Sequence, residues 1–366
     1  MKNSFGSAIT VTLFGESHGE CVGAVIDGLP GGIIIDEDDI AKEMKKRQGI
    51  AEISTPRKEE DKVEFLSGVL NGYSEGTPLT LIIRNQNTRS SDYSQMQEIA
   101  RPSHADYTAE VKYHGYQDVR GGGHFSGRLT AALVAAGAIL KKALEDKGIY
   151  IGSHIARLHG IEDENFHDDI LEDIHLLNHK EFPALNQEAE AKMIECIKEA
   201  RDRSDSVGGI LESAIFGLEA GIGEPFFDSV ESVLAHAMLA VPGIKGISFG
   251  AGFALADMYG SEANDPFEIR NGKVQTVTNH SGGINGGISN GMPVIFSTVV
   301  KPTASIAQLQ KTVNFKKMED TELLIHGRHD PAIIHRARAV VDAMSAICIA
   351  DLLAQRYGYE YLRSQR

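Results

Sequence analysis

Apolar residues recur at helical spacing in several stretches of the chain, and these stretches predict the main helices. After a turn at 28–32, Asp36 begins a segment in which Ile40 and Met44 are four residues apart and Gly49 ends the pattern. This arrangement predicts a helix with Asp36 as its N-cap. The same reasoning predicts helices over 126–144, 188–201, 228–239 and 337–353. The last of these is apolar on more than one face and is expected in the core.

Short apolar runs bounded by turn residues predict strands at 22–26, 32–35, 79–83 and 210–218. The turn 28–32, within the sequence DGLPGG (27–32), joins the first two of these strands. Hairpin signals dominate over regular strand–helix–strand alternation, which favours an α+β fold. Strands precede helices in both halves of the chain, and this order suggests an internal duplication.

Two long segments, 101–126 and 279–291, have neither helical nor strand character. Long glycine-rich segments inside a compact chain are more often functional than accidental. Catalytic and binding residues are therefore expected in these two segments.

Length and net charge limit the number of domains and the classes of ligand to be expected. The chain has 366 residues and a formal net charge of −15. Its length suggests two domains at about 150 residues each, with one large domain as the alternative. The negative charge argues against nonspecific binding to nucleic acid or to anionic membranes, so an anionic ligand would need a local Arg/Lys cluster.

The cysteines and the hydropathy pattern indicate a cytoplasmic protein. Cys21, Cys196 and Cys348 are odd in number and far apart, as expected of reduced thiols. The N-terminal residues do not form a signal-peptide pattern, and no apolar run of about 18 residues predicts a membrane span.

Two of five polar segments contain a candidate catalytic histidine. In GESHG (15–19), flanking glycines leave His18 unshielded, so it could donate a proton near neutral pH, or it could be an ordinary surface histidine. In RPSHAD (101–106), Arg101 beside His104 suits an anion with a proton to be moved. Asp106 could orient His104 or cap the next segment.

The other three segments suggest anion binding. RGGGHFSGR (120–128) leads into a predicted helix and carries two arginines, which predicts an anion site; a flexible loop with Ser126 as N-cap is the alternative. It is neither a P-loop nor a dinucleotide fingerprint. The segment 279–291 with KPTAS (301–305) offers glycines, one cation and two hydroxyls for a phosphate tail, or merely a strand end and a turn. GRHDP (327–331) is typical of an active-site edge.

A catalytic metal is not expected, because the chain has no HExxH motif and no paired CxxC motif. A metal-dependent phosphate-ester enzyme is nevertheless kept as an alternative function. A non-catalytic flavin or anion carrier is a third possibility.

In this order the segments resemble the chorismate synthase family, over residues 14–353. The resemblance implies an anti-1,4-elimination of phosphate from 5-enolpyruvylshikimate 3-phosphate, with reduced FMN and without net redox change. It also implies one domain spanning 1–366, a sandwich of antiparallel β-sheets around central helices, and a homotetramer.

The resemblance further implies roles for individual residues. His18 would protonate or hydrogen-bond the departing phosphate, His104 would serve the N1 side of the flavin, and Asp330 would help remove a proton from flavin N5. Four arginines would bind the substrate's anionic groups: Arg47, Arg101, Arg128 and Arg328. The positions that match FMN contacts are His124, Phe125, Ser126, Pro242, Gly243, Gly286, Lys301, Pro302, Thr303, Ala304, Ser305 and Arg328.

Two departures from the family pattern concern a nicotinamide cofactor. Lys46 and Glu52 stand where many members carry two arginines, and Glu52 would repel a 2′-phosphate. These two residues put an NADPH site in doubt. We therefore expect the protein to have no flavin reductase activity of its own and to depend on an external flavin reductase for reduced FMN.

Overall fold

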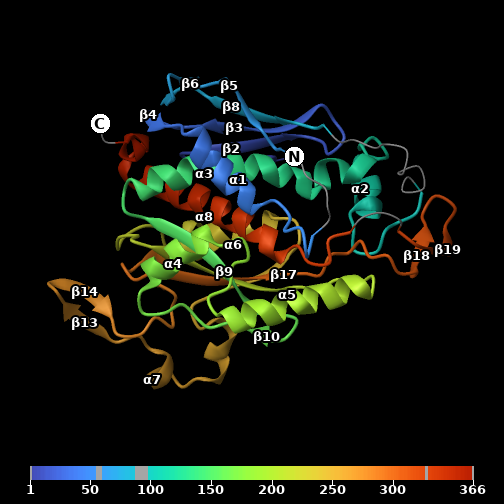
Figure 1. Cartoon of the computed structure of the whole chain (residues 1–366). Helices are drawn as coiled ribbons and strands as arrows, with labels where there is room; N and C mark the ends of the chain where they lie inside the picture. The colour runs from blue at the N-terminus through green and yellow to red at the C-terminus, as the bar shows by residue number, and fades with distance from the viewer. Residues whose placement is uncertain (1, 55–59, 87–97, 326–328, 365–366) are drawn as a thin grey trace.

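Two five-stranded antiparallel sheets enclose a pair of long helices (Figure 1). The computed structural model describes residues 2–54, 60–86, 98–325 and 329–364. The first sheet has the order β1 (Ser4–Phe5), β2 (Thr10–Gly15), β3 (Cys21–Asp27), β8 (Leu79–Arg84), β5 (Val63–Ser67). The second has the order β10 (Ile161–Glu162), β9 (Tyr150–Leu158), β11 (Gly209–Phe216), β17 (Val294–Val300), β12 (Ile244–Phe249).

The central helices are α3 (Thr130–Glu145) and α8 (Ile334–Tyr357). They pack on each other; α3 also contacts β3 and β8, whereas α8 contacts β9 and β11. Their crossing is close at Gly137, where a Cβ would lie 2.4 Å from that of Ala343. Both helices are buried on most sides, because each is covered by a sheet on one side and by its neighbour on another.

The two sheets repeat one topology. The first is built in the chain order β2, β3, α1 (Glu37–Lys46), β5, β8, α3, and the second in the order β9, β11, α6 (Val230–Ala240), β12, β17, α8. In both sheets the fourth strand lies between the second and the third, and the long central helix follows it. The α+β class predicted from the sequence is thus observed.

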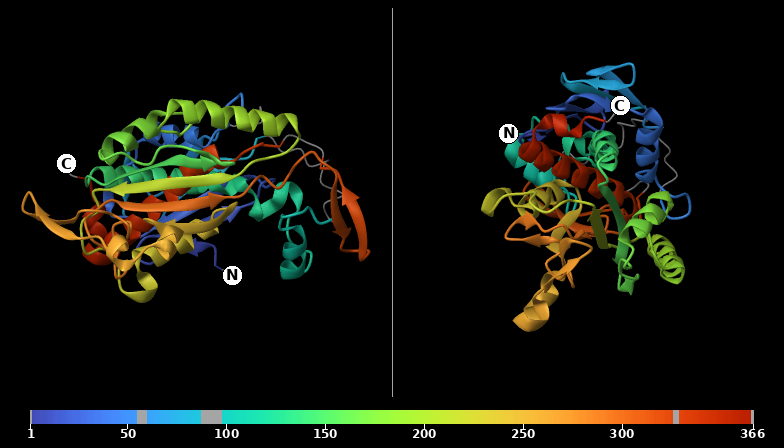
Figure 2. Two further views of the ribbon diagram at one scale, coloured as in Figure 1. Left: turned by 90° about the horizontal axis from the view of Figure 1, so that it is seen from below. Right: turned by 90° about the vertical axis from the view of Figure 1, so that its left-hand side faces the viewer.

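The remaining elements lie around this body. The helices are α2 (Asp106–Tyr113), α4 (Ile170–His179), α5 (Gln187–Asp202) and α7 (Gly260–Ala263). Short strands form β4–β7–β6 (Gly31–Ile34, Tyr73–Glu75, Val69–Leu70) and the hairpins β13–β14 (Phe267–Arg270, Lys273–Thr276), β15–β16 (Ile284–Asn285, Ile288–Ser289) and β18–β19 (Gln310–Asn314, Glu319–Leu323). The segment that contains α7 and β13–β14 extends away from the body (Figures 1 and 2).

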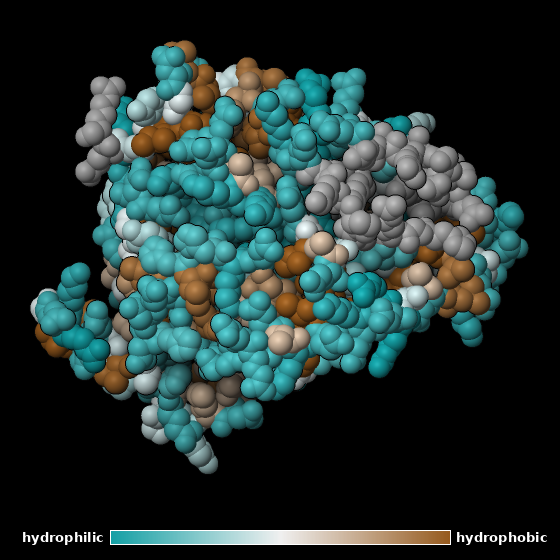
Figure 3. Space-filling view, viewed as in Figure 1, coloured by the Kyte–Doolittle hydropathy of each residue, from teal (hydrophilic) through white to brown (hydrophobic). Residues whose placement is uncertain are grey.

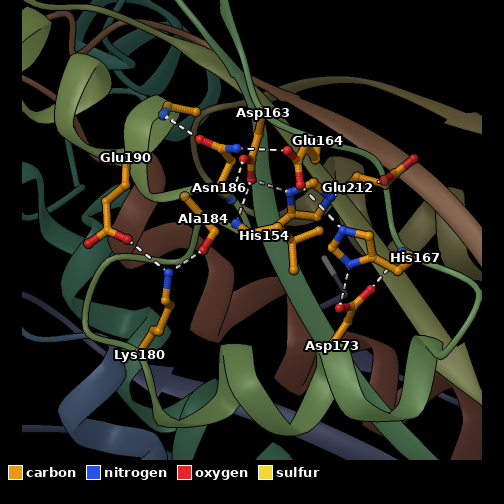
Figure 4. A network of polar contacts seen from close by, with 12 residues as sticks. His154, Asp163, Glu164, His167, Asp173, Lys180, Ala184, Asn186, Glu190 and Glu212 are labelled. Carbon is orange, nitrogen blue, oxygen red and sulfur yellow. Dashed lines mark hydrogen bonds and ion pairs between the residues drawn. The ribbon is translucent and has the colours of Figure 1, made fainter.

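A buried polar network fastens the α4–α5 layer to the second sheet (Figure 4). His154 of β9 is fully buried, and its Nδ1 and Nε2 lie 2.9 Å from Asp163 and 3.0 Å from Glu212. Burial opposes protonation, but the hydrogen bonds to the two carboxylates prevail and raise the pKa of His154. Asp163 also accepts hydrogen bonds from the main-chain N–H groups of Leu185 and Asn186, so the network positions the start of α5.

Most of the predicted elements are confirmed. Asp36 caps α1 by accepting hydrogen bonds from the N–H groups of Asp38 and Asp39. The predicted helices 188–201, 228–239 and 337–353 correspond to α5, α6 and α8, and the four predicted strands to β3, β4, β8 and β11. None of the helices described is long and apolar enough to cross a membrane.

Three local predictions were wrong. The segment 101–126 contains α2 and a 3-10 turn, Arg120–Phe125. The helix predicted from 126 begins as α3 at Thr130, because Ser126 caps a separate 3-10 turn, Gly127–Leu129. The segment 279–291 contains the β15–β16 hairpin. The turn 28–32 joins two strands as predicted, and these strands belong to different sheets, since β3 pairs with β2 and β8 whereas β4 pairs with β7. Helix α4 was not predicted.

Candidate active site

The turn between β2 and β3 holds His18 against the glycine-rich loop 120–125. The His18 side chain is largely buried, and a Cβ at Gly121 would lie 2.1 Å from its Nδ1, so only glycine fits there. The N–H of Ser17 donates to Gly123 O at 3.1 Å, and His124 Nδ1 donates to Gly15 O at 2.9 Å. The first and third motifs therefore form one structure.

Sheet register brings further polar residues to the same end of the first sheet. Cys21 pairs with Arg84 and Val63 pairs with Ile83, so Asn85 and Asp61 emerge beside the His18 turn. Asn85 donates through Nδ2 to the carbonyls of Glu16 (3.0 Å) and Gly19 (2.9 Å), and its Oδ1 accepts from Arg128 Nε at 2.9 Å. Asn85 thus links Arg128 to the turn that carries His18.

Two predicted substrate-binding arginines, Arg47 and Arg128, meet at Asp61. The Asp61 side chain is only 3% exposed; it accepts from Arg47 Nη1 at 3.0 Å and forms a short ion pair with Arg128. Arg47 also donates to Thr130 Oγ1 (2.9 Å) and to Gly127 O (3.0 Å) at the start of α3. Asp61 thus holds both guanidiniums next to the start of α3.

Asp330 is connected to this group through Arg336. Arg336 Nη1 lies 2.5 Å from Asp330 Oδ2, and Arg336 Nε donates to Arg47 O at 2.9 Å. Arg47 is the C-cap residue of α1. The Arg336 guanidinium therefore holds the Asp330 carboxylate close to the end of α1, where the predicted substrate-binding residue Arg47 lies.

His104 lies in a second group. Its Nδ1 is 3.0 Å from Pro102 O, and its Nε2 is 2.8 Å from Ser305 Oγ. Burial, followed by the charge of Arg101, lowers the pKa of His104, so the ring is neutral near pH 7. A carbonyl only accepts, so the proton is on Nδ1 and Nε2 accepts from the Ser305 hydroxyl. Lys301 Nζ donates to Ser103 O at 3.0 Å and fastens the same loop.

Asp106 does not orient His104. Its carboxylate accepts from Arg101 Nε at 2.8 Å and Nη2 at 2.7 Å, so Arg101 is held in a bidentate pair. Arg101 is therefore already paired within its own motif.

Most of the residues predicted to contact FMN lie at one end of the second sheet. Ile244 and Gly209 both pair with Val300, so Pro242, Gly243 and the segment 301–305 emerge together. The N–H of Lys301 donates to Gly243 O at 2.9 Å, and Ser206 Oγ donates to Thr303 O at 2.7 Å.

One contact joins this end to the residues around Asp330, because the N–H of Val207 donates to Pro331 O at 2.8 Å. The rings of Tyr113, at the end of α2, and Phe125 meet edge-on at 6.1 Å between centroids and join α2 to the glycine-rich loop. Gly286 lies in the β15–β16 hairpin, and in the described part of the chain no hydrogen bond joins it directly to the other candidate residues. Arg328 lies outside the described residues.

Sequence reasoning missed Asp61, Asn85 and Arg336. Asp61 follows a run of charged residues, where an acidic residue is usually exposed on the surface. Asn85 is a single polar residue after a predicted strand and belongs to no motif. Arg336 follows GRHDP and directly precedes the predicted buried helix 337–353. This position is the one signal in the sequence that indicates a role for it. Among the described residues no group of three or more His, Cys, Asp or Glu side chains is arranged to hold a metal ion.

Comparison with known proteins agrees on one family. The family model described as chorismate synthase matches residues 9–354. A chorismate synthase of Dehalococcoides mccartyi (strain BAV1) is 45% identical over 354 residues, covering 96% of both chains. One of Thermococcus gammatolerans is 43% identical over 360 residues, covering 97% of this chain and 98% of the relative. A solved structure described as a crystal structure of chorismate synthase has a TM-score of 0.75 at 27% identity, covering 96% of this chain and 94% of that one.

Proposed function

The chain belongs to the chorismate synthase family, and from this premise we propose that His18, His104 and Asp330 are its catalytic residues. The reaction is the elimination of phosphate from 5-enolpyruvylshikimate 3-phosphate, which gives chorismate. The observation that supports His18 and Asp330 is the continuous hydrogen-bonded connection from the His18 turn to Asp330. His104 is supported by its hydrogen bond to Ser305, within the segment predicted to contact FMN.

His18 is proposed to donate a proton or hydrogen bond to the departing phosphate. A leaving phosphate develops negative charge, and a donor aimed at that charge lowers the barrier more than it strengthens ground-state binding. The close packing on Gly121 restricts the His18 ring to one place, so its orientation is set before substrate arrives.

Arg47 and Arg128 are proposed to bind the anionic groups of the substrate, together with Arg101 and Arg328. The guanidiniums of Arg47 and Arg128 are cationic donors in an acidic chain, and their buried positions strengthen the attraction to an anion. Asp330 is proposed to help remove a proton from flavin N5, with Arg336 holding its carboxylate in place.

The residues around His104 fit reduced FMN. Thr303 Oγ1 is buried and, within the described residues, has no hydrogen-bond partner, which suits a ligand phosphate oxygen. Lys301, Thr303 and Ser305 would hold the phosphate tail, Pro302 and Ala304 would shape the loop, and the remaining contacts would come from His124, Phe125, Ser126, Pro242, Gly243 and Gly286. When bound, reduced FMN supplies transient electron density for the elimination, with no net redox change. His104 would serve the N1 side of the flavin. Its neutral ring would there exchange the hydrogen bond that Nε2 accepts from Ser305 for a hydrogen bond with the flavin.

The proposed function is tested by turnover under anaerobic conditions. With reduced FMN, the purified protein should convert 5-enolpyruvylshikimate 3-phosphate to chorismate and release one phosphate, and excess EDTA should leave the rate unchanged. With oxidised FMN alone the rate should fall to background. Loss of activity in EDTA, restored by a divalent cation, would instead favour the metal-dependent phosphate-ester enzyme.

The source of reduced FMN is proposed to be external. The Lys46 side chain is directed to Glu43 and Asn178, and Glu52 pairs with Lys198, so neither residue supplies a cation for a 2′-phosphate. NADPH with oxidised FMN should therefore give no chorismate, and addition of a separate flavin reductase should restore full turnover. Chorismate formation with NADPH and no reductase would contradict this expectation.

Self-association into a homotetramer in the cytoplasm is also proposed. Phe226, Phe227 and Phe253 are almost fully exposed, and the protruding β13–β14 hairpin exposes Phe267 and Ile269. Apolar side chains on an extended arm are typical of contacts between subunits. All three cysteines are free thiols, as a reducing compartment favours.

An internal duplication within one domain is the last part of the proposal. One buried apolar cluster runs from Ile9 to Leu362, which supports a single domain. The two groups of site residues occupy equivalent places in the repeated topology: Asp61 and Gly243 precede the third strand of each sheet, and Asn85 and Lys301 follow the fourth. Each half therefore contributes the same end of its sheet to the site.

A further inference from the structure

The segment that follows α5 holds two parts of the proposed site. Helix α5 lies on the surface, where Figure 3 shows mainly hydrophilic side chains over it, and the chain leads from its end into β11. In this connection Ser206 Oγ donates to Thr303 O at 2.7 Å, and the N–H of Val207 donates to Pro331 O at 2.8 Å. Adjacent residues thus contact the segment proposed to bind the FMN phosphate and the residue that follows Asp330.

The connection between α5 and β11 has little freedom to move. The Asp205 carboxylate accepts from the N–H of Ser206 at 2.8 Å. Val207 is 6% exposed and belongs to the hydrophobic core. A Cβ at Gly208 would lie 2.5 Å from Val300 O, so only glycine allows this close approach to β17. The Ser206 hydroxyl is therefore attached to a fixed piece of the chain.

The segment proposed to bind the FMN phosphate is fixed at its start, middle and end. The N–H of Lys301 donates to the main chain before β12 at 2.9 Å, which fixes the start. Ser305, at the end, is bonded to His104, and FMN is proposed to replace that bond. The bond from Ser206 fixes the middle, where Thr303 Oγ1 is buried and has no partner among the described residues.

A hydrogen bond to the main chain of Thr303 also orients its hydroxyl. Threonine is β-branched and has few side-chain conformations, so the direction of Oγ1 follows from the position of the main chain. A segment that is ordered before the ligand arrives loses less conformational entropy on binding. The bond from Ser206 should therefore strengthen the binding of a phosphate at Thr303 without touching the phosphate.

We propose that Ser206 is a positioning residue for reduced FMN, which acts through Thr303. Because Val207 at the same time holds Pro331, one fixed piece of chain sets the separation between Thr303 and Asp330. These two residues are proposed to act at the phosphate and at the ring of the same cofactor, so this separation has to match the length of FMN. The inference rests on the FMN contact proposed for Thr303.

Anaerobic turnover at saturating substrate, with the concentration of reduced FMN varied, tests the role of Ser206. Ser206→Ala should raise the FMN concentration that gives the half-maximal rate by about 2- to 10-fold, the effect of one hydrogen bond. The kcat at saturating FMN should stay close to the wild-type value, because Val207 still holds Pro331. Substrate affinity without flavin, measured by calorimetry, should also stay unchanged. A serine that only stabilised the fold would not separate these quantities.

Two further variants are controls for Ser206→Ala. Ser206→Thr keeps the hydroxyl and should need no more FMN than the wild type. Ser345→Ala removes a fully buried hydroxyl that donates to Val341 O at 2.9 Å within α8, and it should leave the FMN requirement unchanged.

Thr303→Val separates this inference from the proposed function. It removes the hydroxyl proposed to contact FMN and should weaken FMN binding at least as much as Ser206→Ala does. An unchanged FMN requirement in Thr303→Val would overturn the proposed contact and the inference with it. A weakened Thr303→Val beside an unchanged Ser206→Ala would overturn the positioning role alone. The same holds for a Ser206→Ala protein that also loses substrate affinity, or for a Ser206→Thr protein as weak as Ser206→Ala.

Discussion

His18→Ala is expected to lower kcat by about 10²–10⁴-fold, the usual contribution of one positioned acid or base. The reason is that His18 lies in a fixed orientation beside the glycine loop, where a proton or hydrogen bond can reach the departing phosphate. Substrate affinity without flavin should change much less, because the arginines rather than His18 supply most of the charge. Anaerobic turnover with reduced FMN measures the first quantity, and calorimetry with substrate alone measures the second.

A second substitution at the same position separates proton transfer from hydrogen bonding. His18→Gln keeps an N–H donor but cannot give up a proton near neutral pH, so a rate as slow as that of His18→Ala would indicate proton donation. Recovery of most of the rate would indicate hydrogen bonding alone. His114→Asn, at an exposed histidine with a positive φ that Asn tolerates, is the control. Wild-type turnover in His18→Ala would contradict the catalytic role and favour a flavin or anion carrier.

Local patterns in the sequence were sufficient where a single segment determines its own structure. Helix α1 was predictable because Asp36 caps it and Ile40 and Met44 lie on one buried face. Helix α4 has a comparable signal, with Asp169 as N-cap and the buried Ile174 and Leu177 at helical spacing, so the sequence also contains the information for this helix. The strands were predictable singly, but not their order.

Sheet order depends on contacts between distant segments, which periodicity does not encode. β3 pairs with β8 across more than fifty residues of intervening chain, and this pairing is what brings Asn85 beside the His18 turn. The sequence likewise does not determine that Asp106 pairs with Arg101, because a carboxylate near both an arginine and a histidine could bind either side chain. The histidines and Asp330 were identifiable because glycine and proline mark their loops, whereas Asp61 has no such neighbours.

Asp61→Asn is expected to lower the free energy of unfolding by about 3–5 kcal/mol, the typical cost of removing one partner of a buried ion pair. The substitution keeps the size of the side chain, and Asn tolerates the positive φ of this position, so the lost charge is the main change. Arg47 and Arg128 are buried and would then lack the carboxylate that they share. Urea unfolding of the variant and the wild type measures the difference. Asp39→Asn, which breaks only the exposed pair with Lys42, should cost less than about 1 kcal/mol and serves as the control.

The same variant also tests whether the two arginines form an anion site. If they do, inorganic phosphate should raise the midpoint of thermal unfolding more for Asp61→Asn than for the wild type, because the guanidiniums no longer have their internal carboxylate and bind the anion more tightly. Asp39→Asn should respond to phosphate as the wild type does. An Asp61→Asn protein that is destabilised yet gains no more from phosphate than the wild type would confine Asp61 to a structural role. Arg47 and Arg128 would then no longer be candidates for substrate binding.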